Sequence, residues 1–113
     1  MKPIKFQHQE LANGRWQKLS FFEQMANVGS EVERALLWKE KNNAEYSNLA
    51  FERVLELLDL TTDDSKNRKK LYELLRLREV LVDYFCFQNI FSSSGKLWRS
   101  YFMPFNFAAR INC

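Results

Sequence analysis

Histidine, cysteine, glycine and proline are all scarce in this chain of 113 residues, which contains one His, two Cys, three Gly and two Pro. So few glycines and prolines argue against a turn-rich β-sandwich or barrel. Hydrophobic residues make up 46% of the chain, which argues against a disordered segment. Two cysteines are too few for a disulfide framework. Cys86 stands in an aromatic run and is therefore predicted to be a small core residue.

The shortage of histidine also restricts the chemistry that the chain can perform. A zinc or di-iron site needs several closely spaced ligands, and His8, Cys86 and Cys113 lie far apart in the sequence. Helical-bundle ribonucleases of the HEPN type use an Arg that is followed by a His a few residues later. No Arg precedes His8, the one His of this chain. The three glycines stand alone, so no glycine-rich loop can hold a phosphate. We therefore predict a non-enzymatic protein without catalytic residues, metal ligands or cofactors.

Long apolar runs are missing as well. No stretch of about 18 apolar residues is present to span a membrane, and the first ten residues do not resemble a secretory signal. A soluble protein located in the cytoplasm is expected. The 17 basic and 14 acidic residues give a net charge of +3, which by itself indicates no polyanionic partner.

Apolar residues recur at helical spacing through most of the chain. Ser20 and Glu23 form a capping-box pattern, Asn42 and Asn43 repeat a capping signal, and Thr61–Asp64 provide a third. These signals predict helices over residues 20–40, 42–60 and 65–91, with a fourth from about residue 94 that is kinked at Pro104. The predicted fold is an all-α antiparallel four-helix bundle over residues 19–113, preceded by an irregular arm over residues 1–18. Three apolar residues of this arm are expected to hold it against the bundle; they are Phe6, Leu11 and Trp16.

Two residues inside these predicted helices suggest specific contacts. Gly29 is costly in a helix interior, so it is expected to allow the close approach of another helix. Arg78 interrupts the apolar series of the third helix, and a charge at such a position must reach solvent or meet a carboxylate. We predict a buried ion pair between Arg78 and Glu31.

Two groups of side chains are candidates for binding other molecules. Basic residues at the start of the third helix and in the last helix could contact phosphates; they are Lys66, Arg68, Lys69, Lys70, Arg76, Lys96 and Arg99. The last helix also carries more large rings than one small core should absorb, which predicts an interface with a partner. The rings of this candidate interface are Trp98, Tyr101, Phe102, Phe105 and Phe107.

Three segments of the sequence, residues 29–35, 49–60 and 77–85, resemble a group of small all-helical prokaryotic proteins of unassigned function. The resemblance implies an all-helical fold and no site residues. In architecture the chain is also similar to small four-helix-bundle proteins that form rings and bind nucleic acid beside a larger enzyme.

These observations favour a non-enzymatic interaction protein that self-associates into a homo-oligomer and binds a protein partner, with no role at a membrane. The alternative is an accessory protein that binds RNA or DNA through the basic face of a helix.

Overall fold

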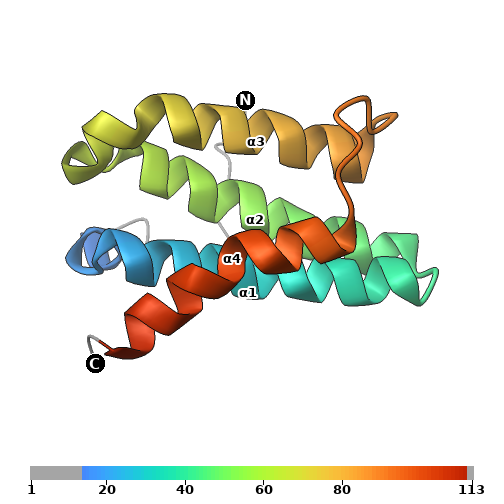
Figure 1. Ribbon diagram of the computed structural model, residues 1–113, viewed down its shortest axis with the longest axis horizontal. Helices are drawn as coiled ribbons and strands as arrows, with labels where there is room; N and C mark the ends of the chain where they lie inside the picture. Colours follow the sequence, from blue (N-terminus) through green and yellow to red (C-terminus); the bar gives the residue numbers. More distant parts are fainter. Residues whose placement is uncertain (1–13, 112–113) are drawn as a thin grey trace, which may run out of the picture.

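The computed structural model describes residues 14–111, and this part of the chain forms an all-α bundle (Figure 1). Its elements are the 3-10 helix η2 (Trp16–Lys18), α1 (Phe21–Glu40), α2 (Ala44–Asp63), the 3-10 helix η3 (Ser65–Lys70), α3 (Leu71–Cys86) and α4 (Gly95–Ile111). Helix α2 packs between α1 and α3, and α4 lies across α1. The predicted all-α four-helix bundle is confirmed.

The helix starts follow the capping signals in the sequence. At the start of α1, the Ser20 Oγ accepts a hydrogen bond from the Glu23 backbone N–H at 3.1 Å. The Glu23 carboxylate in turn accepts from the Ser20 backbone N–H at 3.0 Å, which completes the predicted capping box. At the start of α2, the Asn43 side chain accepts from the Tyr46 N–H at 3.0 Å. Each side chain satisfies a backbone donor that the first helical turn leaves without a partner.

The predicted bounds of the third helix, 65–91, are wrong at both ends. Residues 65–70 form the 3-10 helix η3, and α3 ends at Cys86. Asp64 caps η3 by accepting from the Lys66 N–H, and the buried Asn67 donates to the Thr61 backbone oxygen at 2.9 Å. Short polar side chains that bond to nearby backbone compete in this way with the α-helical hydrogen bonds. Cys86 is the last residue of α3 and is exposed, so its predicted place in the core is also wrong.

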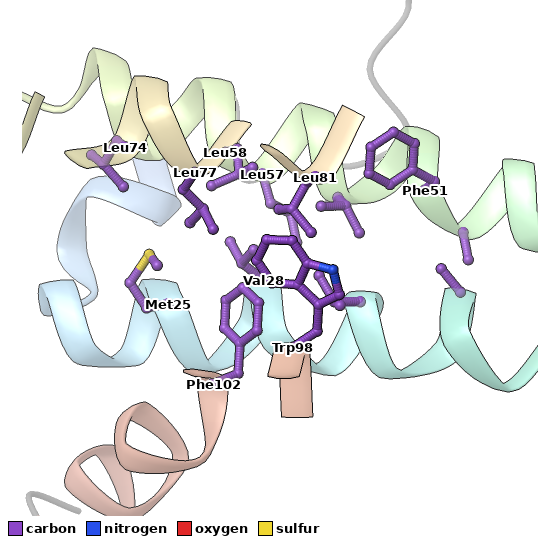
Figure 2. Packing of buried hydrophobic residues seen from close by; sticks show 14 of the residues in the cluster. Met25, Val28, Phe51, Leu57, Leu58, Leu74, Leu77, Leu81, Trp98 and Phe102 are labelled. Atoms are coloured by element: carbon purple, nitrogen blue, oxygen red, sulfur yellow. The ribbon is translucent and has the colours of Figure 1, made fainter. Parts of the chain in front are cut away.

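The core lies between α1, α2, α3 and the first half of α4 (Figure 2). Met25 and Val28 of α1 are fully buried, as is Leu81 of α3. Trp98 and Phe102 of α4 are only 6% and 4% exposed, and both rings point into this core. These two rings were expected at an interface with a partner, but they are buried within the chain.

Gly29 lies where α4 packs on α1. A Cβ built at position 29 would be 2.9 Å from both the Cβ and the Cδ1 of Phe102. The predicted close approach of another helix at Gly29 is therefore confirmed. The helix α4 continues through Pro104 without a restart, and its second half runs at an angle to the first in Figure 1. Such a change of direction is typical of a proline inside a helix.

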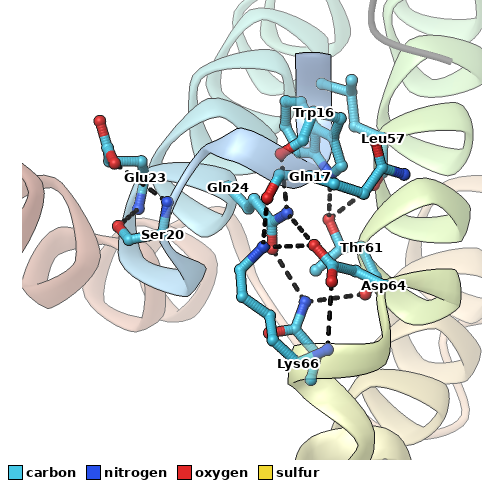
Figure 3. Close-up of polar contacts among 10 residues, drawn as sticks. Trp16, Gln17, Ser20, Glu23, Gln24, Leu57, Thr61, Asp64 and Lys66 are labelled. Atoms are coloured by element: carbon cyan, nitrogen blue, oxygen red, sulfur yellow. Dashed lines mark hydrogen bonds and ion pairs between the residues drawn. The ribbon is translucent and has the colours of Figure 1, made fainter. Parts of the chain in front are cut away.

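A buried polar network joins the segment before α1 to the end of α2 and to η3 (Figure 3). Gln24 is fully buried and donates Nε2 to the Trp16 backbone oxygen at 3.0 Å and to Asp64 Oδ2 at 2.8 Å. The Gln24 Oε1 accepts from Asn67 Nδ2 at 2.8 Å. Thr61 Oγ1 accepts from the indole Nε1 of Trp16 at 3.0 Å. Trp16 is 1% exposed and is thus an anchor as expected, while Phe6, His8 and Leu11 lie outside the described residues.

Asp64 carries the negative charge of this network. Burial raises the pKa of Asp64, but the hydrogen bonds from Lys66 and Gln24 outweigh it and the pKa is lowered. The Lys66 Nζ contacts Asp64 Oδ2 and donates to the Gln17 backbone oxygen at 3.0 Å. A carboxyl group with a lowered pKa stabilises the fold above the ordinary pKa of an aspartate. This contribution is lost as the pH falls through the lowered value.

Candidate interaction surface

The seven basic residues proposed for nucleic-acid contacts do not form one surface. Those of η3 lie at one end of the bundle, whereas Lys96 lies at the start of α4 at the other end (Figure 1). Arg99 donates to Glu33 at 2.8 Å and to Glu40 at 2.9 Å. These bonds raise the pKa of Arg99 and lower that of Glu40. Arg99 is therefore part of the α1–α4 contact.

Three more of these basic residues have partners within the chain. Lys66 belongs to the buried network around Asp64. Arg76 contacts Glu79 at 3.5 Å and lies 4.5 Å from the centre of the Phe91 ring. The Lys70 Nζ lies 4.8 Å from the centre of the Phe21 ring. The remaining two members of the η3 group, Arg68 and Lys69, are exposed.

The predicted ion pair of Arg78 with Glu31 is wrong. The Arg78 Nε donates to Asp59 Oδ1 of α2 at 3.1 Å, and the Arg78 side chain is 40% exposed. Glu31 instead lies 3.9 Å from Arg34 on its own helix. The reason is the order of the helices: α3 packs on α2, so position 78 meets a carboxylate of α2 and not of α1.

The remaining rings of the last helix differ in exposure. Phe107 is 65% exposed, while Phe105 and Tyr101 are partly buried against the core. The Tyr101 hydroxyl donates to Glu73 Oε1 at 3.3 Å. Burial and the nearby Glu73 carboxylate raise the pKa of Tyr101 to about 12, so this hydroxyl stays protonated. Most of the aromatic rings of the last helix thus belong to the core or pack against it, and the Phe107 ring is exposed.

A further apolar surface lies on α3, where large apolar side chains are found outside the core-facing side as well as on it. Leu74, Leu77 and Leu81 face the core and are buried. Tyr72 is nevertheless 85% exposed and Leu75 51% exposed. Exposed large apolar side chains on the outer side of α3 indicate that this side is suited to contact with another molecule.

The loop after α3 extends this apolar side. The buried Asp83 accepts backbone hydrogen bonds from Ile90 at 2.9 Å and from Phe91 at 3.1 Å. Asn89, with a φ of 56°, donates to the Ser93 backbone oxygen at 2.9 Å and accepts the Ser93 N–H at 2.9 Å. These bonds fold residues 87–94 back along α3 with a defined backbone.

This folded loop carries large apolar side chains that point to solvent. Phe87 is 73% exposed and Ile90 is 72% exposed. Between the loop and α3 lies a groove of about 660 Å³. We call the exposed apolar residues that line this groove the outer α3 surface; they are Leu75, Phe87, Ile90 and Phe91.

The apolar spacing of the sequence predicts Leu71, Leu75 and Val82 on the core side of the third helix, but this prediction is wrong for Leu71 and Leu75, which are 41% and 51% exposed. Leu71, Leu75 and Val82 recur at intervals of four and seven residues, beside the buried series that contains Leu74 and Leu81. Two parallel apolar series on one helix indicate two apolar sides. The second series includes Leu75 of the outer α3 surface.

Asp83 positions the loop, and its replacement tests that role. We expect Asp83→Ala to lower the free energy of unfolding by about 1–3 kcal/mol, because two backbone N–H groups of the loop lose a carboxylate acceptor, and hydrogen bonds to charged groups are the stronger ones. The free energy that protects the Ile90 and Phe91 amides against hydrogen exchange should fall by a similar amount. Glu52→Ala, which removes an exposed carboxylate on α2, should leave both amides protected. Unchanged exchange in Asp83→Ala would contradict the positioning role.

Clusters of metal-ligand side chains and membrane-spanning helices are both absent from the described part of the chain. Across residues 14–111, no three His, Cys, Asp or Glu side chains gather as metal ligands would. Among the same residues, no helix combines the length and the apolar character needed to cross a membrane. No protein-family model, curated protein or solved structure matches the chain. The protein is therefore classed by its own geometry, as an all-α four-helix bundle with an exposed apolar groove.

Proposed function

We propose that this protein is a non-catalytic interaction protein of the cytoplasm and that the outer α3 surface is its binding site. The partner is a protein that supplies an apolar segment to the groove between α3 and residues 87–94. The exposed thiol of Cys86 fits a reducing compartment, where cysteines stay unpaired.

One observation carries this proposal: a loop with a well-bonded backbone holds Phe87 and Ile90 in solvent beside an apolar groove. Single exposed apolar residues are common on proteins, but a contiguous apolar patch is typical of a binding site. The hydrogen bonds of Asp83 add a second argument, because a loop with a fixed backbone loses little entropy when a partner binds.

Peptides selected from a random library test this proposal directly. The probe is a phage-displayed library selected on the protein, immobilised sparsely enough to keep the chains apart. We expect selected peptides with apolar residues at helical spacing, the pattern of a helix lying in a groove. Leu75→Lys should weaken their binding about tenfold or more, equivalent to ~1.4 kcal/mol.

The matched control is Leu49→Lys, which changes a leucine of similar exposure on α2, 42% against 51% for Leu75. This control should bind the selected peptides as the wild type does. Equal binding to wild type and Leu75→Lys would overturn the proposed site.

Nucleic-acid binding, the alternative function, has less support. Lys66, Arg76 and Arg99 are engaged with carboxylates of the chain, which weakens them as phosphate contacts. Arg68 and Lys69 remain exposed on η3. With two or three phosphate contacts per chain, the slope of the logarithm of affinity against the logarithm of salt concentration is only about −2 to −3, and binding is correspondingly weak.

A further inference from the structure

Helices α3 and α4 face each other across a cleft that is separate from the outer α3 surface. Helix α3 packs on α2 and α4 packs on α1, so contact between α3 and α4 is made mainly by side chains. The Trp98 indole points from α4 toward Leu77 and Leu81 of α3 (Figure 2). A cleft of about 390 Å³ remains between the two helices. Sites for small ligands usually have volumes of about 300–1,000 Å³, so the cleft is large enough to hold one.

Aromatic and aliphatic side chains form most of the lining of this cleft. Tyr72, Leu77 and Val80 come from α3, and Trp98 and Tyr101 come from α4. The planes of the Trp98 and Tyr101 rings are at 76° to each other and their centres are 6.3 Å apart, so the two rings form a corner and not a stack. Tyr72 is 85% exposed and therefore lies at the mouth of the cleft. Aromatic rings attract cations through the partial negative charge of their faces.

The charge beside these rings is negative. Glu73 lines the cleft, accepts a hydrogen bond from the Tyr101 hydroxyl at 3.3 Å, and forms no ion pair within the described part of the chain. Because the pKa of Tyr101 is raised to about 12, this hydroxyl keeps the proton that it donates. Arg76 also lines the cleft, but its guanidinium pairs with Glu79 at 3.5 Å and lies over the Phe91 ring. The uncompensated charge at the cleft is thus that of Glu73.

We propose that this cleft binds an alkylated ammonium group, as carried by choline-like small molecules or by a methylated lysine side chain, with the rings around its alkyl groups and the Glu73 carboxylate beside its charge. Such a group carries positive charge on an apolar surface and is less strongly hydrated than a bare ammonium, which suits aromatic walls. The same attraction operates within the chain, where the Lys41 Nζ lies 5.1 Å from the centre of the Trp38 ring. The cleft shares no residue with the groove of the outer α3 surface, so the inference does not depend on the proposed function.

Choline and a neutral analogue of the same shape test the site. The analogue is the alcohol that has a tert-butyl group in place of the trimethylammonium group. Binding is followed by the NMR shifts of the Trp98 indole N–H and of the backbone amides along the cleft. We expect choline to bind with a dissociation constant on the order of 1 mM, and the neutral analogue to bind about fivefold more weakly. Equal binding of the two probes, or no shift with choline, would overturn the inference.

Two substitutions test the charge and the rings separately. Glu73→Gln keeps the size of the side chain and removes its charge, so it should weaken choline binding about threefold to fivefold and leave the neutral analogue unaffected. Tyr72→Leu removes a ring that is 85% exposed and contributes little to the fold, and it should weaken choline binding by a similar factor. Glu52→Gln, which changes an exposed carboxylate of α2, is the control and should bind choline as the wild type does. Choline binding that is unchanged in either cleft variant would overturn the inference.

Peptides with a central trimethyl-lysine and random flanking residues distinguish the two sources of the group. If the ligand is a modified protein, the tightest peptide should bind at least about tenfold more tightly than choline, because its flanking residues add contacts. A smaller difference assigns the cleft to a small molecule. In both cases the same peptide with an unmodified lysine should bind more weakly to the wild type. Equal binding of the methylated and unmodified peptides would overturn the preference for an alkylated ammonium group.

Discussion

Gln24→Leu should lower the free energy of unfolding by about 3–5 kcal/mol, the largest expected effect of a single substitution in this protein. Gln24 is fully buried and bonds to the Trp16 backbone oxygen, to Asp64 and to Asn67. Leucine has a similar size but no polar atoms, so these groups would lose partners away from water. The loss is severe because Asp64 is charged: it keeps its contacts with Lys66 but loses the Gln24 donor, and removing one partner from a buried charge is costly.

Urea denaturation followed by circular dichroism measures this effect. The matched control is Gln17→Leu, because Gln17 is exposed and only its backbone oxygen takes part in the network. This control should change stability by less than about 0.5 kcal/mol, as is usual for surface substitutions. A loss below about 1 kcal/mol for Gln24→Leu would show that the network is not a main source of stability.

Gly29→Leu should detach α4 from α1 and lower the free energy of unfolding by about 3 kcal/mol or more. A Cβ at position 29 would already be 2.9 Å from the Cβ of Phe102, an atom held by the α4 backbone. The added side chain cannot be accommodated by a rotation of the Phe102 ring alone. The helix α4 must move away, and Phe102 and Trp98 then lose the burial that holds them at 4% and 6% exposure.

Tryptophan fluorescence reports this movement, because the emission of Trp98 should shift to longer wavelength as its indole meets water. Ser30→Leu is the control, since it places the same side chain on the next, exposed residue of α1. Gly29→Ala should cost less than Gly29→Leu, because it adds only the Cβ, and the gain in helix propensity over glycine, up to ~1 kcal/mol, offsets part of the overlap. Full stability of Gly29→Leu would contradict the close packing of the two helices.

The aromatic rings expected at an interface with a partner belong to the same helix, α4. The number of aromatic residues in the last helix predicts a surface for a partner. Trp98 and Phe102 are instead buried in the core, where α4 packs on α1. The bundle uses these rings because α3 packs mainly on α2 and leaves that side of α1 to α4. On α3, by contrast, Tyr72 and Leu75 contact no other helix closely enough to be buried.

The sequence by itself determined the helical class, the starts of α1 and α2 and the need for a small residue at Gly29. The helical class and the two helix starts depend on residues within one or two turns of each other, so capping side chains and apolar spacing are enough to predict them. Gly29 stands out because a glycine is costly in a helix interior unless close packing requires it.

Only the tertiary structure decided the end of α3, the partner of Arg78 and the side of each helix that stays exposed. The loop after α3 depends on Asp83 meeting backbone groups that follow the helix, and Arg78 meets Asp59 because α3 lies beside α2. The network of Gln24 joins residues from three separate elements. Such contacts form between residues far apart in the chain or in irregular segments, and local spacing carries no information about them.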